Sequence, residues 1–150
     1  MTKRLYPDHP IVGVGVVILK GGKILLGKRL NEPAKGKWSI PGGAVELGET
    51  IEHAVIREAK EETCLDVSEP TLFDVINELD FDKQDKVRYQ FVIVDYLVTV
   101  KGSCEPKAAS DAVELRWVPL NEVEAFDLTR SFRFFFTRNQ QKMEEISSVQ

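Results

Sequence analysis

Three glutamates at helical spacing are the residues in this sequence most able to do chemistry. Residues 51–63 follow a good N-cap residue, Thr50, and their apolar positions recur with the period of a helix. At about 100° per residue these apolar positions fall on one arc roughly 140° wide. Glu58 and Glu62 lie inside that arc and Glu61 lies at its edge, so the predicted helix carries acid on its inward face. The apolar positions are Ile51, Ala54, Val55, Ala59 and Leu65.

Carboxylates that face a protein interior need protons, arginines or a cation to offset their charge. Arg57 is the local cation, and its i,i+4 position allows it to pair with Glu61. Glu58 and Glu62, one turn apart, are then left without a local countercharge. Mg²⁺ and Mn²⁺ favour oxygen ligands of this kind and usually bring phosphate oxygens with them. We therefore predict a metal platform, although an isolated run of this composition could equally be a solvated, salt-bridged face.

The segment before the helix favours the metal interpretation. Residues 38–43 read Trp-Ser-Ile-Pro-Gly-Gly, an aromatic and apolar stretch that runs into paired glycines. Paired glycines let the backbone approach a ligand closely and expose its polar groups. We therefore expect this loop to add a backbone ligand to the acidic cluster.

Together these residues resemble the signature of the Nudix hydrolase family. That signature begins with a glycine, followed after five intervening residues by a glutamate and after seven more by arginine-glutamate and an apolar residue. One intervening residue then precedes a pair of glutamates, and another precedes a second glycine and a final apolar residue. Cys64 stands where the family has its second glycine, so Cys64 must adopt left-handed geometry or the helix must end differently. The positions that match are Gly43, Glu49, Arg57, Glu58, Ala59, Glu61, Glu62 and Leu65.

The resemblance implies hydrolysis of a diphosphate bond with Mg²⁺ or Mn²⁺ as cofactor, because divalent ions offset the charge on the phosphoryl oxygens and acidify a water. It makes Glu58 and Glu62 the principal metal ligands. Glu61 would be a third ligand or the base that activates water, and the Gly42 carbonyl would be a backbone ligand.

Two further signature residues would support that cluster. Arg57 would orient Glu61 during catalysis. Glu49 would bind the metal through a water or hold the start of the helix.

Four residues outside the signature are candidates for binding substrate. Lys28 and Arg29 end a predicted strand and could contact phosphates, or could lie in a solvated basic loop. Trp38 belongs to the segment that enters the glycine pair. Phe81, in a polar hairpin loop, could stack on a base, although local packing is the stronger expectation.

Acidic residues before the Arg-Trp strand are candidates for the general base or an extra ligand. Many Nudix hydrolases carry such a residue there, and some nucleoside triphosphate sanitisers place a glutamate where this chain has Ala112. Asp111 and Glu114 flank that position, and either could take the role or be a surface charge.

The resemblance implies a substrate in which a nucleoside diphosphate is linked to a moiety X. Residues 38–43 together with residues 111–120 resemble the soluble ADP-ribose pyrophosphatase branch, which favours ADP-ribose as substrate, with AMP and ribose 5-phosphate as products. A nucleoside triphosphate pyrophosphohydrolase that removes oxidised or non-standard nucleotides is the alternative, weakened by Ala112. A regulatory domain that binds a nucleotide without hydrolysing it is an alternative of another class. Members of the ADP-ribose branch are commonly dimers, so a homodimer is possible.

Composition sets the remaining limits. With 150 residues and 43% apolar content, we expect a single domain over 1–150, a core over about 8–137 and a frayed tail over about 144–150. A net charge of −4 argues against duplex nucleic acid as a partner. Two cysteines are too few for a disulfide framework, which indicates a cytoplasmic location. The apolar run 11–19 is too short to span a membrane.

The order of predicted elements indicates an α/β protein with a mixed sheet between helices. The resemblance sharpens this to a Nudix α/β/α sandwich with a central mixed β-sheet. Besides the acidic helix, we expect strands at 11–19, 24–27, 71–79 and 87–100 and a short one before Pro119, a hairpin turn at 20–23, and helices at 121–125 and 128–143.

Overall fold

The computed structural model describes residues 3–109 and 112–148. Its elements, in chain order, are β1 (Ile11–Val17), β2 (Leu19–Lys20), β3 (Lys23–Arg29), β4 (Trp38–Ser39), β5 (Gly42–Ala44), α1 (Ile51–Thr63), β6 (Val67–Phe81), β7 (Val87–Val100), β8 (Ala112–Pro119), the 3₁₀ helix η1 (Leu120–Ala125) and α2 (Arg130–Ser147).

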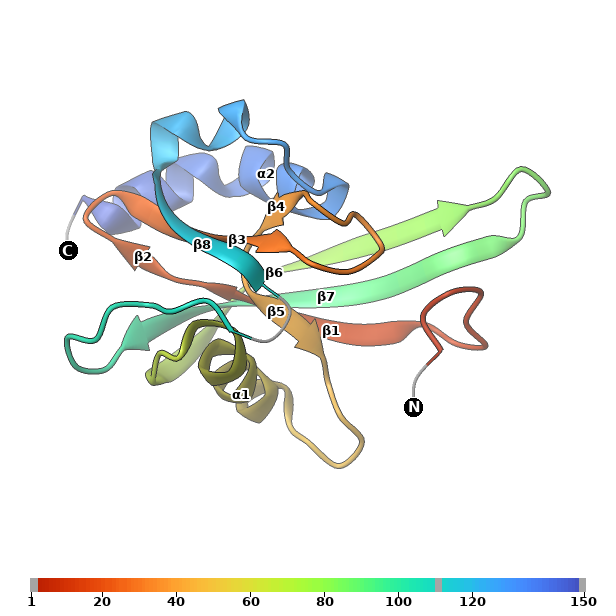
Figure 1. Cartoon of the computed structure of the whole chain (residues 1–150), viewed down its shortest axis with the longest axis horizontal. Coiled ribbons are helices and arrows are strands. Elements are labelled where there is room, and N and C mark those ends of the chain that lie inside the picture. The colour runs from red at the N-terminus through yellow and green to blue at the C-terminus, as the bar shows by residue number, and fades with distance from the viewer. Residues whose placement is uncertain (1–2, 110–111, 149–150) are drawn as a thin grey trace.

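The strands form two four-stranded sheets rather than one central sheet (Figure 1). The first has the order β5-β1-β7-β6, and the parallel pairing of β1 with β7 beside antiparallel neighbours makes it mixed. In the second, β3 pairs with β2, β4 and β8. The predicted hairpin at 20–23 is confirmed by the pairing of Lys20 with Lys23.

The two helices lie on opposite sides of the strands, with α1 below and α2 above in Figure 1. Each helix closes its own apolar core, because each has one apolar face. Val55 and Ala59 of α1 pack with buried residues of β1 and β3. Phe132 and Phe136 of α2 pack with the opposite faces of the sheets. This arrangement confirms the predicted α/β architecture with helices on both sides.

The segment between β3 and α1 differs from the loop that we expected. Trp38–Ser39 and Gly42–Ala44 are short strands, and β5 pairs with Gly13–Gly15 of β1. Strands this short carry too few residues to show an alternating pattern in the sequence. The pairing fixes the Gly42–Gly43 backbone at a sheet edge beside α1.

The strand expected at 71–79 is longer than predicted at both ends. β6 runs continuously from Val67 to Phe81, and the register shift between Ser68 and Thr71 accommodates Glu69 and Pro70 as a bulge. Pro lacks a backbone N–H, so an edge strand with a bulge can include it. β6 and β7 consequently form one long hairpin, seen projecting to the right in Figure 1.

The carboxyl-terminal helix is longer than predicted and begins later. The Thr129 side chain accepts a hydrogen bond from the Phe132 N–H, and α2 continues to Ser147. Residues 144–147, expected to fray, are therefore helical, since the buried Met143 and the partly buried Ile146 hold this end against the core. The short helix η1 begins one residue before the expected 121–125, with Pro119 at its N-cap position. No helix in the described part of the chain is long and apolar enough to cross a membrane.

Candidate active site

The acidic helix has the predicted bounds, and both of its ends are capped. The Thr50 hydroxyl accepts a hydrogen bond from the His53 N–H at 3.1 Å. At the other end Cys64 adopts left-handed geometry, with φ 64°, and its N–H donates to the Lys60 carbonyl. Cys64 thus ends the helix as the family's glycine would, at the steric cost that a side chain adds there.

Glu58 and Glu62 face the protein, as the sequence predicted, and each is 8% exposed. The Gly42 N–H donates to Glu62 Oε2 at 2.6 Å, which ties α1 to β5. A Cβ placed on Gly43 would lie 2.5 Å from Glu58 Cδ, so only glycine leaves room for this carboxylate. The Gly42 N–H therefore positions Glu62, and the absence of a side chain on Gly43 leaves room for Glu58.

Arg57 is the centre of the ion pairs on α1. It donates to Glu61 at 3.1 Å, as expected for an i,i+4 pair, and also to the Ala44 carbonyl at 3.0 Å. It further donates to Glu58 Oε1 at 2.8 Å. The prediction that Glu58 has no local countercharge is therefore wrong, because the guanidinium reaches its sequence neighbour across the helix surface. Hydrogen bonds to Glu49 and Glu58 raise the pKa of Arg57, so this cation stays charged.

Glu49 holds the start of the helix. Its carboxylate accepts two hydrogen bonds from Arg57, at 2.6 and 2.9 Å, and one from the Glu46 N–H. The hydrogen bonds from Arg57 lower the pKa of Glu49 to about 2 against the opposing effect of burial. Of the two roles expected for Glu49, these contacts support the structural one.

Glu61 is more open to solvent than its two neighbours, with a side chain 49% exposed. This matches its predicted place at the edge of the inward arc. Within residues 3–109 and 112–148, no three His, Cys, Asp or Glu side chains converge as a metal site.

The segment after β7 returns to the end of α1. The Lys107 N–H donates to the Thr63 carbonyl at 2.8 Å, and the Ala109 N–H donates to the Glu62 carbonyl at 3.2 Å. These bonds satisfy carbonyls that a helix end leaves without partners. They also bring the backbone just before Asp111, which itself lies outside the described residues, to the Glu62 turn.

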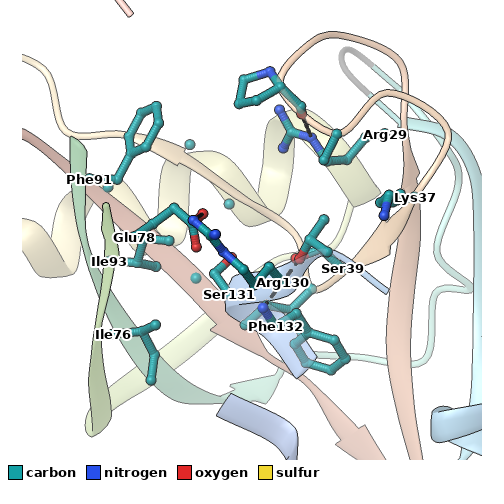
Figure 2. Close-up of a pocket in the computed structure, with 18 of the residues that line it drawn as sticks. Arg29, Lys37, Ser39, Ile76, Glu78, Phe91, Ile93, Arg130, Ser131 and Phe132 are labelled. Atoms are coloured by element: carbon teal, nitrogen blue, oxygen red, sulfur yellow. Dashed lines mark hydrogen bonds and ion pairs between the residues drawn. The ribbon is translucent and has the colours of Figure 1, made fainter. Parts of the chain in front are cut away.

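A cavity of about 650 Å³ opens beside the acidic helix. Gly42, Gly43 and Glu62 line one part of it. Figure 2 shows its other walls: Ile76, Glu78, Phe91 and Ile93 from β6 and β7, Arg29 and Ser39 from the other sheet with Lys37 just before β4, and Arg130, Ser131 and Phe132 at the start of α2. The cavity is large enough for a nucleotide-sized ligand.

Two arginines border this cavity in defined geometry. Arg29 donates to the Pro33 carbonyl at 2.8 Å, which holds the loop after β3. Arg130 donates to Glu78 at 2.7 Å and so joins α2 to β6 across the cavity (Figure 2). An anionic ligand would therefore meet cations from the end of β3 and from the start of α2.

The structure separates the predicted substrate residues into two groups. Lys28 and Arg29 line the cavity. Trp38 does not: it is buried in the α2 core, with its ring edge-on to Phe126 at 5.3 Å. Its apolar ring is placed there by the pairing of β4 with β3.

Two other predicted residues also lie away from the cavity lining. Phe81 is 50% exposed near the tip of the β6–β7 hairpin, and Glu114 pairs with Arg116 on β8. Neither is among the residues that line the cavity in the described part of the chain. A single position in a hairpin or an edge strand gives no signal in sequence for which way its side chain faces.

Sequence reasoning missed Asp95 on β7. Asp95 lines the cavity and is only 2% exposed. Burial raises its pKa to about 7, with a further contribution from the charge of Asp74 and an opposing one from Arg138. The signal was present, because one acid interrupts an otherwise apolar stretch of the strand predicted to lie inside the sheet.

The chain was then compared with known proteins. The NUDIX domain model matches residues 9–138. The ADP-ribose pyrophosphatase of Methanocaldococcus jannaschii is 44% identical over 126 residues, which cover 83% of this chain and 71% of that protein. The 8-oxo-dGTP diphosphatase of Proteus vulgaris is 33% identical over 97 residues, which cover 62% and 86%. The crystal structure of a MutT NUDIX hydrolase from Burkholderia pseudomallei is 31% identical, with a TM-score of 0.73 over 87% of this chain and 98% of that one.

One mixed sheet and one antiparallel sheet between helices, with an acid-bearing helix capped beside a glycine pair, are the fold and site of a class of enzymes that hydrolyse diphosphate bonds. The chain belongs to the Nudix hydrolase family. As a Nudix pyrophosphohydrolase, it carries the family signature on α1 and the segment that precedes it, where the sequence placed it.

Proposed function

We propose that this enzyme hydrolyses ADP-ribose to AMP and ribose 5-phosphate. The observation that carries the proposal is its 44% identity to an ADP-ribose pyrophosphatase over 83% of the chain. The cavity beside α1 supports it, because cationic and aromatic side chains line the same space as Glu62. A diphosphate near Glu62 would leave room in that cavity for the rest of a nucleotide.

The cofactor in this proposal is Mg²⁺ or Mn²⁺. Glu58 and Glu62 supply buried carboxylate oxygens one helical turn apart, which is the donor chemistry that these cations prefer. The space kept by Gly43 fits the same purpose, since a side chain there would displace Glu58. Glu58 and Glu62 would hold the cation, with Glu61 and the Gly42 carbonyl as further oxygen donors.

When bound, a divalent cation offsets the charge of the phosphoryl oxygens and lowers the pKa of a bound water. The chain's own residues supply the rest. Arg57 fixes Glu58 and Glu61 in place and offsets part of their mutual repulsion. Glu61, the most exposed of the three acids, would accept a proton from the attacking water. Arg29 and Arg130 would bind negatively charged parts of the substrate.

The test is turnover of a nucleotide panel with Mg²⁺, resolved by chromatography. We expect ADP-ribose to give AMP and ribose 5-phosphate. We expect Glu61→Gln and Glu62→Gln to lose about a hundredfold or more in kcat, because each substitution keeps shape and removes charge. Glu52→Gln, an exposed change in the first turn of α1, is the matched control and should keep wild-type rates.

The panel also decides between this proposal and its alternatives. Release of pyrophosphate from an oxidised nucleoside triphosphate would favour the second candidate, which the 33% identity to an 8-oxo-dGTP diphosphatase supports. Binding without turnover of any substrate would indicate a regulatory domain. Near wild-type rates for both glutamine variants would refute the roles given to Glu61 and Glu62.

Three further proposals accompany this function: one domain over 1–150, a cytoplasmic location and a homodimer. The homodimer can be checked by light scattering during size-exclusion chromatography, where a mass near twice 17.0 kDa is expected.

A further inference from the structure

Asp95 is a buried acid that faces the cavity without a partner. It lies on β7 between Gly15 of β1 and Asp74 of β6, the residues with which it is in register. Within residues 3–109 and 112–148 no hydrogen bond or ion pair is found for its carboxyl group. Among the described residues the fully buried side-chain oxygen without a partner is Ser147 Oγ, so the Asp95 carboxyl is not sealed off but reaches the cavity, where a ligand can bind it.

The surroundings of Asp95 explain its protonation. On β6, Asp74 is negatively charged, but Arg138 and Asn139 of α2 bind Asp74 itself, with Arg138 Nε at 2.9 Å and Asn139 Nδ2 at 2.7 Å. On β1 and before β5 the neighbours are uncharged: a Cβ on Gly15 would lie 2.8 Å from Ile40 Cδ1 and 3.2 Å from Asp95 Cγ. Burial, the first cause of the raised pKa of about 7, is therefore not offset by a direct cation. Below that pH the group is a neutral acid that can donate one hydrogen bond and accept another.

Asp95 ends a row of cavity residues on one face of β7. Tyr89, Phe91, Ile93 and Asp95 alternate along the strand and all line the cavity, and the rings of Tyr89 and Phe91 stack at 6.3 Å. Alternate residues on a strand are about 7 Å apart. A flat ring that packs on the Ile93 side chain would consequently have its edge beside Asp95. Phe91 and Ile93 are drawn in Figure 2.

We propose that Asp95 is a specificity-determining residue that binds the adenine edge of the substrate through two hydrogen bonds. The acid O–H donates to a ring nitrogen, and the acid carbonyl accepts from the N6 amino group. Adenine offers this acceptor beside a donor, whereas an ionised carboxylate has only acceptors. The proposal rests on the proposed function, since it takes the base from an adenine nucleotide.

Two substitutions separate this role from a structural one. Asp95→Asn keeps one donor and one acceptor in the same shape but does not titrate. Asp95→Leu keeps the volume and removes both. The ligands are AMP, which carries the base, and ribose 5-phosphate, which carries the same kind of phosphate without a base and so controls for phosphate ionisation.

The experiment measures both affinities by calorimetry at pH 6 and pH 8.5. For the wild type we expect AMP to bind about tenfold more weakly at pH 8.5 than at pH 6, after correction for the change seen with ribose 5-phosphate, because ionisation of Asp95 removes the O–H donor of the base contact. Asp95→Asn should bind AMP equally at both pH values. Asp95→Leu should lose about tenfold at pH 6 and leave ribose 5-phosphate unchanged.

Several results would overturn the inference. Unchanged AMP affinity in Asp95→Leu would do so, as would an equal loss for ribose 5-phosphate, or an Asp95→Asn variant that still follows the wild-type pH dependence. If Asp95→Leu does not fold, the pH dependence of Asp95→Asn decides alone. The proposed function fails separately, when the wild type binds AMP as described but does not hydrolyse ADP-ribose.

Discussion

Replacing Gly43 by alanine tests how the glycine pair positions the acidic helix. Gly43 is not in left-handed geometry, so alanine can adopt its backbone conformation. The added Cβ would instead meet the Glu58 carboxylate, 2.5 Å from Cδ and 2.7 Å from Oε2. The substitution therefore acts on the side chain of one proposed metal ligand and leaves the backbone conformation unchanged.

The expected size of the effect follows from these distances. Carbon atoms that do not bond prefer a separation of about 3.5 Å or more, so the Glu58 carboxylate must move by about 1 Å. The Glu58 carboxylate cannot move to another unstrained position nearby, because Glu58 is 8% exposed and its carboxylate is hydrogen-bonded to the Arg57 guanidinium. A misplacement of about 1 Å can cost about a hundredfold in rate. We expect kcat to fall by about that factor with the melting temperature nearly unchanged.

The assay is diphosphate hydrolysis at saturating Mg²⁺, with thermal unfolding followed by circular dichroism. Gly42→Ala is the contrasting variant, because its Cβ would overlap the backbone carbonyl of Val14 across the sheet and should lower stability instead. Gly43→Ala combined with Glu58→Asp shortens the acid and should relieve the clash. Wild-type turnover in Gly43→Ala, or a large loss of stability, would show that Glu58 is not held where we describe it.

Two further predictions concern stability. Asp95 is protonated in the folded state up to about pH 7, while the unfolded chain ionises it above 3.8, so folding stability contributed by this group falls as pH rises through that window and is level above it. At about 1.4 kcal/mol per pH unit, the free energy of unfolding should fall by about 4 kcal/mol across this window. Chemical denaturation at several pH values should show this fall in the wild type and not in Asp95→Asn. Parallel pH profiles for the two proteins would contradict the raised pKa. Cys64→Gly should stabilise the protein by about 1 kcal/mol, because a residue with a side chain pays about that much for the left-handed φ of 64°. The kcat should be unchanged. An unchanged or lower denaturation midpoint would argue against a strained helix end.

Some of the site could be predicted from local sequence alone. The bounds of α1, its Thr50 cap and the inward direction of Glu58 and Glu62 follow from helical periodicity and capping, which depend on residues within a few positions of each other. The strand 87–100 and the hairpin at 20–23 were predicted for the same reason. The signature spacing is also local, so the family could be inferred before any coordinates.

What the sequence could not decide was which distant residues meet. Arg57 reaches Glu49 and Glu58 at once because the loop before α1 folds back over the helix start. Trp38 and Glu114 were candidates in sequence, yet pairing of β4 and β8 with β3 places both outside the cavity lining in the described residues. Asp95 faces the cavity because β7 lies between β1 and β6, where Asp95 pairs with Gly15 and with Asp74. Periodicity fixes the face of an element, while the packing of elements separated by tens of residues fixes what that face meets.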